Sequence, residues 1–416
     1  PIDFIDGDRG INYPTKNEFH DNGYCLFLNT SNIRKGSFDF SQLDFISEEK
    51  NNLLRKGKID FEDIILTTRG TVGNVAYYTS KVKYSRVRIN SGMVIIRCLS
   101  KNIHPYFLYL YFRCPLFRKQ SEKSQSGSAQ PQLPISTLRR FLIPNYSLYI
   151  QQKIASVISS LDDKIELNNR INAELESMAK TLYDYWFVQF DFPDANGKPY
   201  KSSGGKMVYN EELKREIPEG WEVKELGRKF ETLLGGTPST EKKAFWDNGN
   251  INWLNSGEIA NFPVVESELK ITNEGLQKSA TNLLPKGSVL ISITRHLRVT
   301  ILAIDACINQ SVVGIKPKID IQSNYLYPYL KNEIPRLMGL RTGAQQPHIN
   351  KETVDKSLIV LPEERILKIY NEKSESFYKM IINNAKENQH LTSLRDWLLP
   401  MLMNGQVAFK IIDNER

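Results

Sequence analysis

Several features that would place a protein in a common class are scarce in this 416-residue chain. It has only four cysteines, Cys25, Cys98, Cys114 and Cys307, which lie far apart and form no CxxC pair. This excludes a disulfide framework and a cysteine-based zinc site, and it predicts reduced thiols in a cytoplasmic protein. No stretch approaches the roughly 20 apolar residues that a membrane helix needs, so we expect no membrane span. Residues 1–5 do not resemble a signal peptide, and their abrupt beginning without methionine suggests a truncated start.

Motifs of common catalytic sites are also missing. The sequence has no GxxxxGK[ST] loop for nucleotide phosphates, no GxGxxG cofactor fingerprint, no HExxH zinc motif and no GxSxG nucleophile elbow. Its five histidines share no metal-ligand spacing. We therefore predict that this chain is not an enzyme by itself, with no catalytic residue, no metal site and no cofactor of its own.

One pattern resembles the metal site of DNA-cutting enzymes. Asp194 is followed by Glu212 and Lys214, and two carboxylates beside a lysine could hold Mg²⁺ and activate water. These residues fall in a segment rich in glycine, serine and lysine, without apolar strands to fix their positions. A metal-dependent nuclease is therefore the weakest of three functional hypotheses.

The chain does contain a long internal repeat. In each half a stretch rich in glycine, glutamine and proline precedes an apolar segment that ends in proline, and about 40 residues of helical pattern follow. The offset is 216 positions, from Gln130 to Gln346 and again from Leu175 to Leu391. Solenoid repeats have periods up to about 50 residues, so this repeat indicates a duplicated module of a domain and a helix. Two copies in one chain predict a pseudo-two-fold molecule with two separate reading heads.

The repeat and the turn residues together predict an α+β protein. Short β-like runs broken by turns fill the first part of each half, and the apolar segments 141–144 and 358–362 are expected to be closing strands. Five segments are predicted: a first β-rich domain (1–145), a long helix (146–190), a polar linker (191–219), a second β-rich domain (220–362), and a second long helix with the C-terminal tail (363–416).

Both long helices show apolar residues at alternating steps of four and three, which is typical of a coiled-coil seam. The first has one phase shift, at Asn168 and Asn169, and both carry asparagines near the middle. Because each helix follows its own domain, the simplest packing is an antiparallel pair; two amphipathic helices docked on their own domains are the alternative. The seam and subunit-docking residues that we expect are Ile154, Ile165, Leu175, Leu182, Phe377, Leu391, Leu394 and Leu398.

A formal net charge of +8 favours a polyanionic partner. Arg69 lies in a polar turn between two β-like runs, and Arg295, 226 positions later, lies in the matching turn. Arginine suits bidentate contact with guanine and glutamine suits adenine, although a solvated turn or loop residue is the plain alternative for each. The predicted DNA-binding residues are Thr68, Arg69, Arg86, Arg88, Gln130, Gln132, Arg295, His296, Arg298, Arg341, Gln345 and Gln346.

At this point the sequence resembles the specificity (S) subunit of a Type I restriction-modification system over essentially its whole length. The resemblance rests on the order of domain, helix, linker, domain and helix, and on several local strings. These strings are LTTRGTVG (66–73), IQQKIA (150–155), LDDKIELN (161–168), IPEGW (217–221), GGTPS (235–239) and LTSLR (391–395).

The resemblance implies two target recognition domains, each reading one half of a bipartite site on double-stranded DNA. The helices would set the spacing and dock two methyltransferase (modification) subunits, and restriction (motor-nuclease) subunits would join the complex. S-adenosylmethionine, ATP and Mg²⁺ would belong to those partners. A stand-alone two-headed DNA-binding regulator is the second hypothesis.

The sequence departs from the expected pattern at two places. The second half opens with WEVKELG (221–227), which has no counterpart in the first half, so an opening segment is expected to be missing there. The second turn also has His296 and Leu297 where the first has Gly70 and Thr71, which puts its geometry in doubt.

Overall fold

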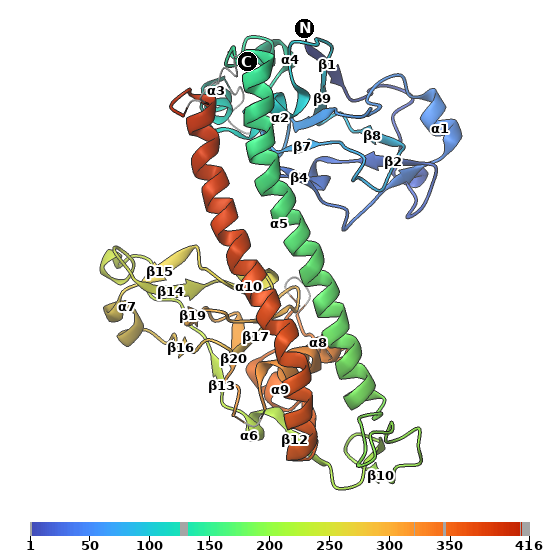
Figure 1. Cartoon of the computed structure of the whole chain (residues 1–416), viewed down its shortest axis with the longest axis vertical. Helices are drawn as coiled ribbons and strands as arrows, with labels where there is room; N and C mark the ends of the chain where they lie inside the picture. The colour runs from blue at the N-terminus through green and yellow to red at the C-terminus, as the bar shows by residue number, and fades with distance from the viewer. Residues whose placement is uncertain (1, 125–131, 320, 344–346, 408, 410–416) are drawn as a thin grey trace, which may run out of the picture. The chain divides into compact units, whose positions relative to one another are not determined.

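The structure is a computed structural model that describes residues 2–124, 132–319, 321–343, 347–407 and 409. The chain divides into two compact units, each with its own β-rich domain and parts of both long helices (Figure 1). Unit 1 comprises residues 1–163 and 391–416, and unit 2 comprises residues 164–390. The mixed α+β class predicted from the sequence is confirmed.

Unit 1 contains two sheets that share a core. The first is antiparallel, with the order β1-β9-β6-β7, and the second has the order β5-β2-β8, in which β2 and β8 run parallel. The strands are short and rich in β-branched residues, and β6 and β8 are buried along their whole length. Their bounds are β1 Ile2–Asp6, β2 Cys25–Leu28, β5 Phe45–Ile46, β6 Ile64–Thr67, β7 Val75–Tyr77, β8 Val87–Ile89 and β9 Met93–Cys98.

Short helices and a small ribbon complete unit 1. The aromatic-rich helix α2 packs on the first sheet through a run of six buried residues. It begins at a proline, which suits the first helical position because that N–H has no partner within the helix. These elements are β3 Ile33–Arg34, β4 Ser37–Phe38, α1 Glu48–Leu53, α2 Pro105–Arg113, α3 Pro115–Ser124 and α4 Ile135–Leu138.

Unit 2 repeats the two-sheet plan. Its first sheet has the order β13-β20-β17-β18 and its second the order β15-β14-β19-β16, again with one parallel pair, β14 and β19. A Cβ at Gly7 would lie 2.1 Å from the carbonyl of Asn90, and one at Gly235 would lie 2.1 Å from that of Ile308. In each unit the residue just after the first strand of this sheet is therefore packed so closely against backbone that only glycine fits. The bounds are β13 Thr232–Leu234, β14 Ile251–Leu254, β15 Leu269–Ile271, β16 Leu283–Leu284, β17 Val289–Ser292, β18 Val299–Ile301, β19 Ala306–Ile308 and β20 Val312–Ile315.

The two predicted closing strands have different outcomes. In unit 2 the predicted strand is present, since β21 (Leu358–Leu361) pairs with β12 (Glu222–Glu225). The helices of unit 2 are α6 (Leu226–Lys229), α7 (Asn273–Gln277), α8 (Ser323–Gly339) and α9 (Lys351–Asp355). In unit 1 the prediction is wrong, because residues 141–147 are irregular and Leu142 is 81% exposed. A strand needs a partner for its backbone groups, and the described part of unit 1 has no strand equivalent to β12.

The two long helices, α5 (Leu148–Tyr183) and α10 (Glu364–Met403), run antiparallel within each unit. In unit 1, Tyr146 just before α5 contacts the carbonyls of Leu402 and Met403, whereas Asp162 meets Arg395. In unit 2, Asn168 of α5 meets Asn388 of α10, and Asn172, four residues later in α5, meets Asn384, four residues earlier in α10. The predicted antiparallel pair is confirmed in both units.

Asparagines occupy the seam between α5 and α10 in unit 2. Asn168, which is 1% exposed, donates to Glu387 at 2.7 Å and to Asn388 at 2.9 Å. One turn later Asn384 donates to the side-chain oxygen of Asn172 at 2.9 Å. Counted with these polar residues the seam keeps its phase, so the predicted phase shift at Asn168 is wrong. A paired asparagine in a seam fixes the register of the two helices.

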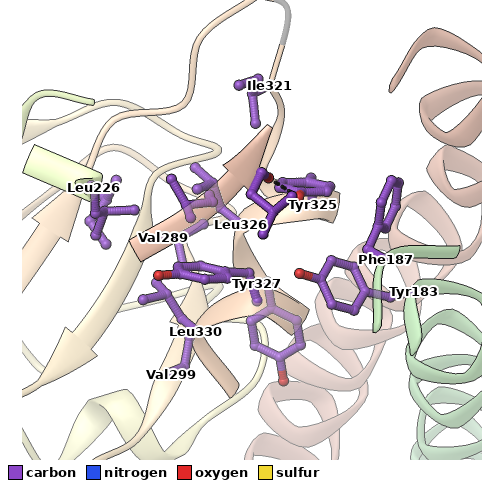
Figure 2. Packing of buried hydrophobic residues seen from close by; sticks show 14 of the residues in the cluster. Tyr183, Phe187, Leu226, Val289, Val299, Ile321, Tyr325, Leu326, Tyr327 and Leu330 are labelled. Carbon is purple, nitrogen blue, oxygen red and sulfur yellow. Dashed lines mark hydrogen bonds between the residues drawn. The ribbon is translucent and has the colours of Figure 1, made fainter. Parts of the chain in front are cut away.

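The segment predicted as a polar linker is folded. It contains a hairpin of β10 (Met207–Asn210) and β11 (Arg215–Pro218). Just before it, at the end of the predicted first long helix, Asp184–Val188 form a π-helical turn. The turn brings Phe187 within 4.8 Å, between ring centroids, of both Tyr325 on α8 and Tyr370 on α10. Figure 2 shows Tyr183 and Phe187 facing Tyr325 at the edge of this core.

No helix in the described part of the chain is long and apolar enough to cross a membrane.

Candidate nucleic-acid interface

The turn of unit 1 that carries Arg69 follows strand β6 and is closed by one buried hydroxyl. The Thr67 hydroxyl donates to the carbonyl of Thr71 and accepts from the N–H of Asn74 at 3.0 Å. Six residues, 68–73, form the turn, and Arg69, Gly70 and Thr71 are exposed on it. A polar side chain that bonds its own backbone in this way fixes a turn without using the exposed residues.

The fold brings the predicted glutamine loop to this turn. Arg69 and Gln132 form an isolated antiparallel β-bridge, and the N–H of Leu133 donates to the carbonyl of Thr68 at 3.0 Å. The Thr68 hydroxyl is directed inward and donates to the carbonyl of Gly92 at 3.1 Å. The structure therefore places Arg69 and Gln132 side by side, whereas Thr68 supports the turn and is 8% exposed.

Unit 2 has a corresponding turn after β17. The Ser292 hydroxyl donates to the carbonyl of His296 at 2.8 Å and accepts from the N–H of Arg298 at 2.9 Å. Thr294 forms a β-bridge with His348, and the N–H of Ile349 donates to the carbonyl of Ile293 at 2.9 Å. Both units thus use a hydroxyl-closed turn held against a second loop.

Strand pairing corrects the register between the two turns. Ile64 pairs with Ile96 and Thr67 with Met93, and the equivalent pairs are Val289 with Ile315 and Ser292 with Val312. Thr67 therefore corresponds to Ser292, an offset of 225 and not the 226 that aligns Arg69 with Arg295. Arg295 corresponds to Gly70, and Arg69 corresponds to Thr294. The second turn has five residues, 293–297, one fewer than the first.

Several other predicted readers lie around these turns. Arg295 and His296 are exposed on the second turn, and Arg298 is exposed directly after it. Arg341 donates from a terminal nitrogen to the carbonyl of Arg295 at 3.0 Å and from Nε to that of Met338 at 3.0 Å. Its guanidinium therefore supports the turn. Gln130, Gln345 and Gln346 fall outside the described residues.

Arg86 and Arg88, predicted together, have different environments. Arg86 is exposed, with its guanidinium 4.3 Å from the centre of the Tyr24 ring. Arg88 is 6% exposed and donates to the Asn51 side chain and to the carbonyls of Asn51, Leu54 and Lys56. Burial lowers the pKa of this guanidinium from its ordinary value. Arg88 holds segment 51–56 on strand β8, which argues against a base-reading role.

The nuclease-like pattern does not form a metal site among the described residues. Asp194 accepts the N–H groups of Asn196 and Lys198 in a turn, and Lys214 lies in the turn of the β10–β11 hairpin. No group of three or more histidine, cysteine or acidic side chains in the described ranges could hold a metal ion. The pattern is therefore explained as loop chemistry.

A cavity of about 540 Å³ opens beside the turn of unit 1 that carries Arg69. Residues 72–75, from the end of the turn to the start of β7, form one wall, and α2, α3 and α10 form the others. Lys35, Arg113, Arg118 and Arg395 line it, against the two carboxylates of Glu122 and Asp396. Arg113 and Arg395 are both paired with Asp162, so the cavity carries only a small excess of positive charge.

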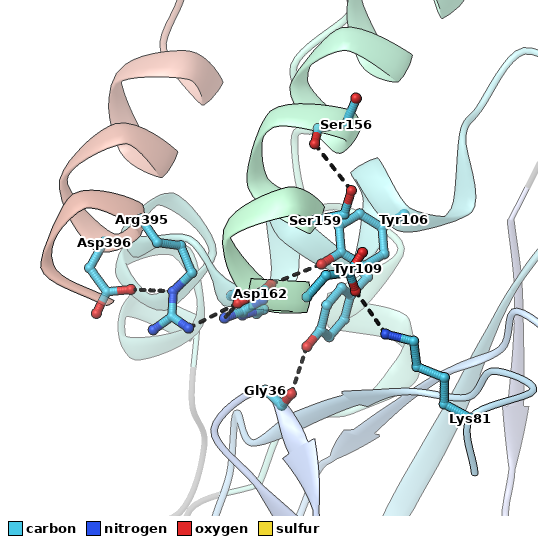
Figure 3. A network of polar contacts seen from close by, with 11 residues as sticks. Gly36, Lys81, Tyr106, Tyr109, Ser156, Ser159, Asp162, Arg395 and Asp396 are labelled. Carbon is cyan, nitrogen blue, oxygen red and sulfur yellow. Dashed lines mark hydrogen bonds and ion pairs between the residues drawn. The ribbon is translucent and has the colours of Figure 1, made fainter. Parts of the chain in front are cut away.

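A carboxylate network joins α2, α5 and α10 in unit 1 (Figure 3). Asp162 accepts from Arg113 at 2.6 Å, from Tyr106 at 2.8 Å and from Arg395 at 3.0 Å. Burial alone raises the pKa of Asp162, but the hydrogen bonds and charge of Arg113, together with Arg395 and Tyr106, outweigh burial and hold this pKa below its ordinary value.

The predicted seam residues differ in burial. Ile154 is fully buried in unit 1, and six others are half-buried, namely Ile165, Leu175, Leu182, Phe377, Leu391 and Leu398. Leu394 is 42% exposed, because Arg395 and Leu399 take the inward positions on this turn of α10. Leu394 instead faces outward together with the neighbouring Trp397, which is 59% exposed and which the sequence analysis did not name. A tryptophan three residues after a leucine is the signal that could have found it.

Comparisons with known proteins can now be set beside this geometry. The model of the Type I restriction modification DNA specificity domain matches residues 4–177 and again residues 218–393. The Type I restriction enzyme MjaIX specificity subunit of Methanocaldococcus jannaschii is 27% identical over 83% of this chain and 77% of its own length. The HindI specificity subunit of Haemophilus influenzae is 24% identical over 96% of this chain and 98% of its own length.

A solved structure shows the same fold. The crystal structure of a Type I restriction-modification S subunit from M. genitalium matches with a TM-score of 0.53 at 14% identity, covering 98% of this chain and 94% of that one. With two copies of the family domain, the chain belongs to the Type I restriction-modification DNA specificity family. These likenesses do not support the alternative of a stand-alone regulator.

Proposed function

We propose that the two units each read one half of a bipartite DNA site. The observation that carries this proposal is the repeated turn: a buried hydroxyl closes it, a second loop holds it, and arginine lies exposed on it in both units. Exposed guanidinium groups on a fixed backbone can enter the major groove and pair with guanine. Arg86, Arg298 and Gln132 are proposed as supporting contacts.

The paired helices α5 and α10 are proposed to set the distance between the half-sites and to dock two methyltransferase subunits. Exposed apolar side chains on both helices, outside their mutual seam, support this docking. They include Leu394 and Trp397 in unit 1 and Met178 and Met380 in unit 2. Aromatic and methionine side chains are enriched at such interfaces. Restriction subunits would join the assembled complex.

The chain itself is proposed to be non-catalytic and cytoplasmic. The methyl donor S-adenosylmethionine, ATP and Mg²⁺ would then be bound by the methyltransferase and restriction subunits. The purified chain should neither cleave nor methylate DNA. Cleavage with Mg²⁺ that is lost in Asp194→Ala would refute this and revive the nuclease pattern.

The first experiment is selection from random duplex DNA with the full chain and its methyltransferase partner. Two short conserved sequences at a fixed separation are the expected result. A single contiguous site, or binding that does not depend on sequence, would contradict two-headed reading.

The second experiment changes the helix length. Seven residues inserted into α5 between Asp163 and Lys164, and seven into α10 between His390 and Leu391, preserve the seam and lengthen both helices by about 10 Å. At 3.4 Å per base pair the preferred gap should grow by about three base pairs, while both half-site sequences stay the same. An insertion in only one helix is the control, because it breaks their pairing. A double insertion that keeps the original gap at full affinity would refute the spacing role.

A further inference from the structure

The turn of unit 2 places an arginine where the corresponding turn of unit 1 has a glycine. In each turn the third residue after the hydroxyl residue has a positive φ, +70° at Gly70 and +53° at Arg295. Glycine adopts this left-handed conformation freely, whereas an L-residue with a side chain is strained there. The strain at Arg295 therefore needs a reason.

The packing of unit 2 does not supply that reason. Arg295 is exposed, and its guanidinium has no hydrogen-bond or ion-pair partner within the described parts of the chain. In unit 1 a Cβ at Gly70 would meet only the Thr30 hydroxyl, at 3.9 Å. Neither turn therefore requires a side chain at this position for its own stability.

The backbone on both sides of Arg295 holds the strained conformation in place. Its N–H donates to the carbonyl of Pro347 at 2.9 Å, and its carbonyl accepts from the Arg341 guanidinium at 3.0 Å. The neighbouring Thr294 is bridged to His348, whose N–H donates to Thr342 at 2.9 Å. The base of the side chain is thus fixed, while its charged end stays available.

We propose that Arg295 is a specificity-determining residue that reads a guanine in the half-site of unit 2, an inference that rests on the proposed function. Strained backbone conformations are typical of functional sites. A role for the Arg295 side chain in binding an external ligand would explain why a strained residue without an internal partner is present here. The two nitrogens of a guanidinium match the O6 and N7 acceptors of guanine. Unit 1 presents Arg69 one position earlier, at an unstrained residue, so the two units offer this group from different backbone positions.

The test compares Arg295→Gly with Arg295→Ala in the full chain. Both variants remove the guanidinium and should weaken binding to the selected site by about 5- to 150-fold, with lost preference at one base pair of one half-site. Only glycine relieves the strain, so only Arg295→Gly should melt higher than the wild type, by about 2 °C. Arg228→Ala, which removes an exposed arginine on α6 of the same unit, is the matched control and should change neither quantity.

Three results would overturn the inference. Equal weakening on every sequence would identify a phosphate contact, unchanged binding would identify a bystander, and a lower melting temperature for Arg295→Gly would show that the side chain stabilises the turn. A wild-type chain that selects no bipartite site refutes the proposed function itself, and the inference falls with it.

Discussion

The two units share a strand order but secure the long helices in different ways. In unit 1 the side chains of Arg113 and Arg395 converge on Asp162, and all three are mostly buried, with side-chain exposures of 11%, 17% and 23%. In unit 2 Lys331 and Tyr327 meet Glu176, but that ion pair is more exposed, at 40% and 28% for its two side chains. The aromatic cluster around Phe187 and Tyr370 adjoins it.

Both units place a basic side chain one helical turn after a tyrosine on the helix that contacts α5, but the basic residue differs. Arg113 lies 5.2 Å from the Tyr109 ring centre and Lys331 lies 5.4 Å from that of Tyr327, each one helical turn after its tyrosine. Arginine has a planar fork that can bind a carboxylate with two nitrogens, which lysine cannot do. Both units bury apolar side chains of the two helices, but unit 1 adds a largely buried ion-pair network, whereas the corresponding ion pair of unit 2 is more exposed.

The largest effect should come from removing the carboxylate of unit 1. Asp162→Ala leaves the largely buried Arg113 without its carboxylate, whereas Arg395 keeps Asp396, and the loss costs about 3 kcal/mol. Glu176→Ala in unit 2 frees a lysine that water can reach, so it costs about 1 kcal/mol or less. Hydrogen exchange of α2 against α8 measures the two losses separately. Equal loss of protection in both helices would break the comparison.

The next effect concerns the reading turns. Arg69→Ala should weaken binding by about 1–3 kcal/mol and relax the preference at one base pair, on the half-site that Arg295 variants leave unchanged. Arg88→Ala should instead lower the stability of unit 1 while the folded fraction keeps its base preference. Competition binding with single-base variants of the selected site checks both. Loss of preference at the same position in Arg69 and Arg295 variants would contradict two independent heads.

A smaller effect is expected in the polar seam of unit 2. Asn168→Ala removes a buried side chain that donates to Glu387 and Asn388. Because Glu387 is exposed and Asn388 is half-buried, water can replace the lost bonds, and the loss of stability should be about 1 kcal/mol. Asn383→Ala, at an exposed position on α10, is the control and should be nearly neutral. Urea unfolding followed by the exchange protection of residues 164–183 measures the difference. Equal stability of the two variants would show that the seam asparagine is dispensable.

The smallest effect is the acid sensitivity of unit 1. The pKa of Asp162 is lower in the folded chain than in the unfolded chain, so its contribution is complete above the ordinary carboxyl pKa, about 3.9, and is lost as pH falls through the folded pKa. Below about pH 4, unit 1 of the wild type should lose more stability than unit 1 of Asp162→Asn. Protection of α2 across this pH range is the measurement, and parallel losses in the two proteins would contradict the linkage.

Much of the fold could be predicted because its signals are periodic. The duplication, the two β-rich domains and the antiparallel helices follow from patterns that repeat over tens of residues. The phase of the seam could not be followed through Asn168 and Asn172, since apolar residues alone were counted. The segment 141–144 reads as a strand, but pairing depends on a distant partner that local sequence does not reveal.

The candidate site was predictable in place but not in register. The repeat in the sequence located both turns and the loop that contains Gln132. The structure shows that this loop lies beside Arg69. The first turn has six residues and the second five, which shifts the alignment of the two turns by one position, and only the strand pairing reveals that shift.

The environment of Arg88 could not be predicted from the sequence either. Arg88 lies between buried Val87 and Ile89, and alternation predicts an outward side chain until segment 51–56 is seen to cover that face.

The hydroxyl that closes each turn has an evolutionary consequence. Thr67 and Ser292 bond only to backbone atoms of their turns, so the exposed residues between those bonds contribute little to the core. With the proposed role of these turns in reading DNA, substitutions at positions such as 69–71 or 295–296 would change which base is preferred at little risk to folding, and the turn length itself differs by one residue between the units. Heritable changes of target can therefore accumulate in these few codons while selection preserves the scaffold beneath them.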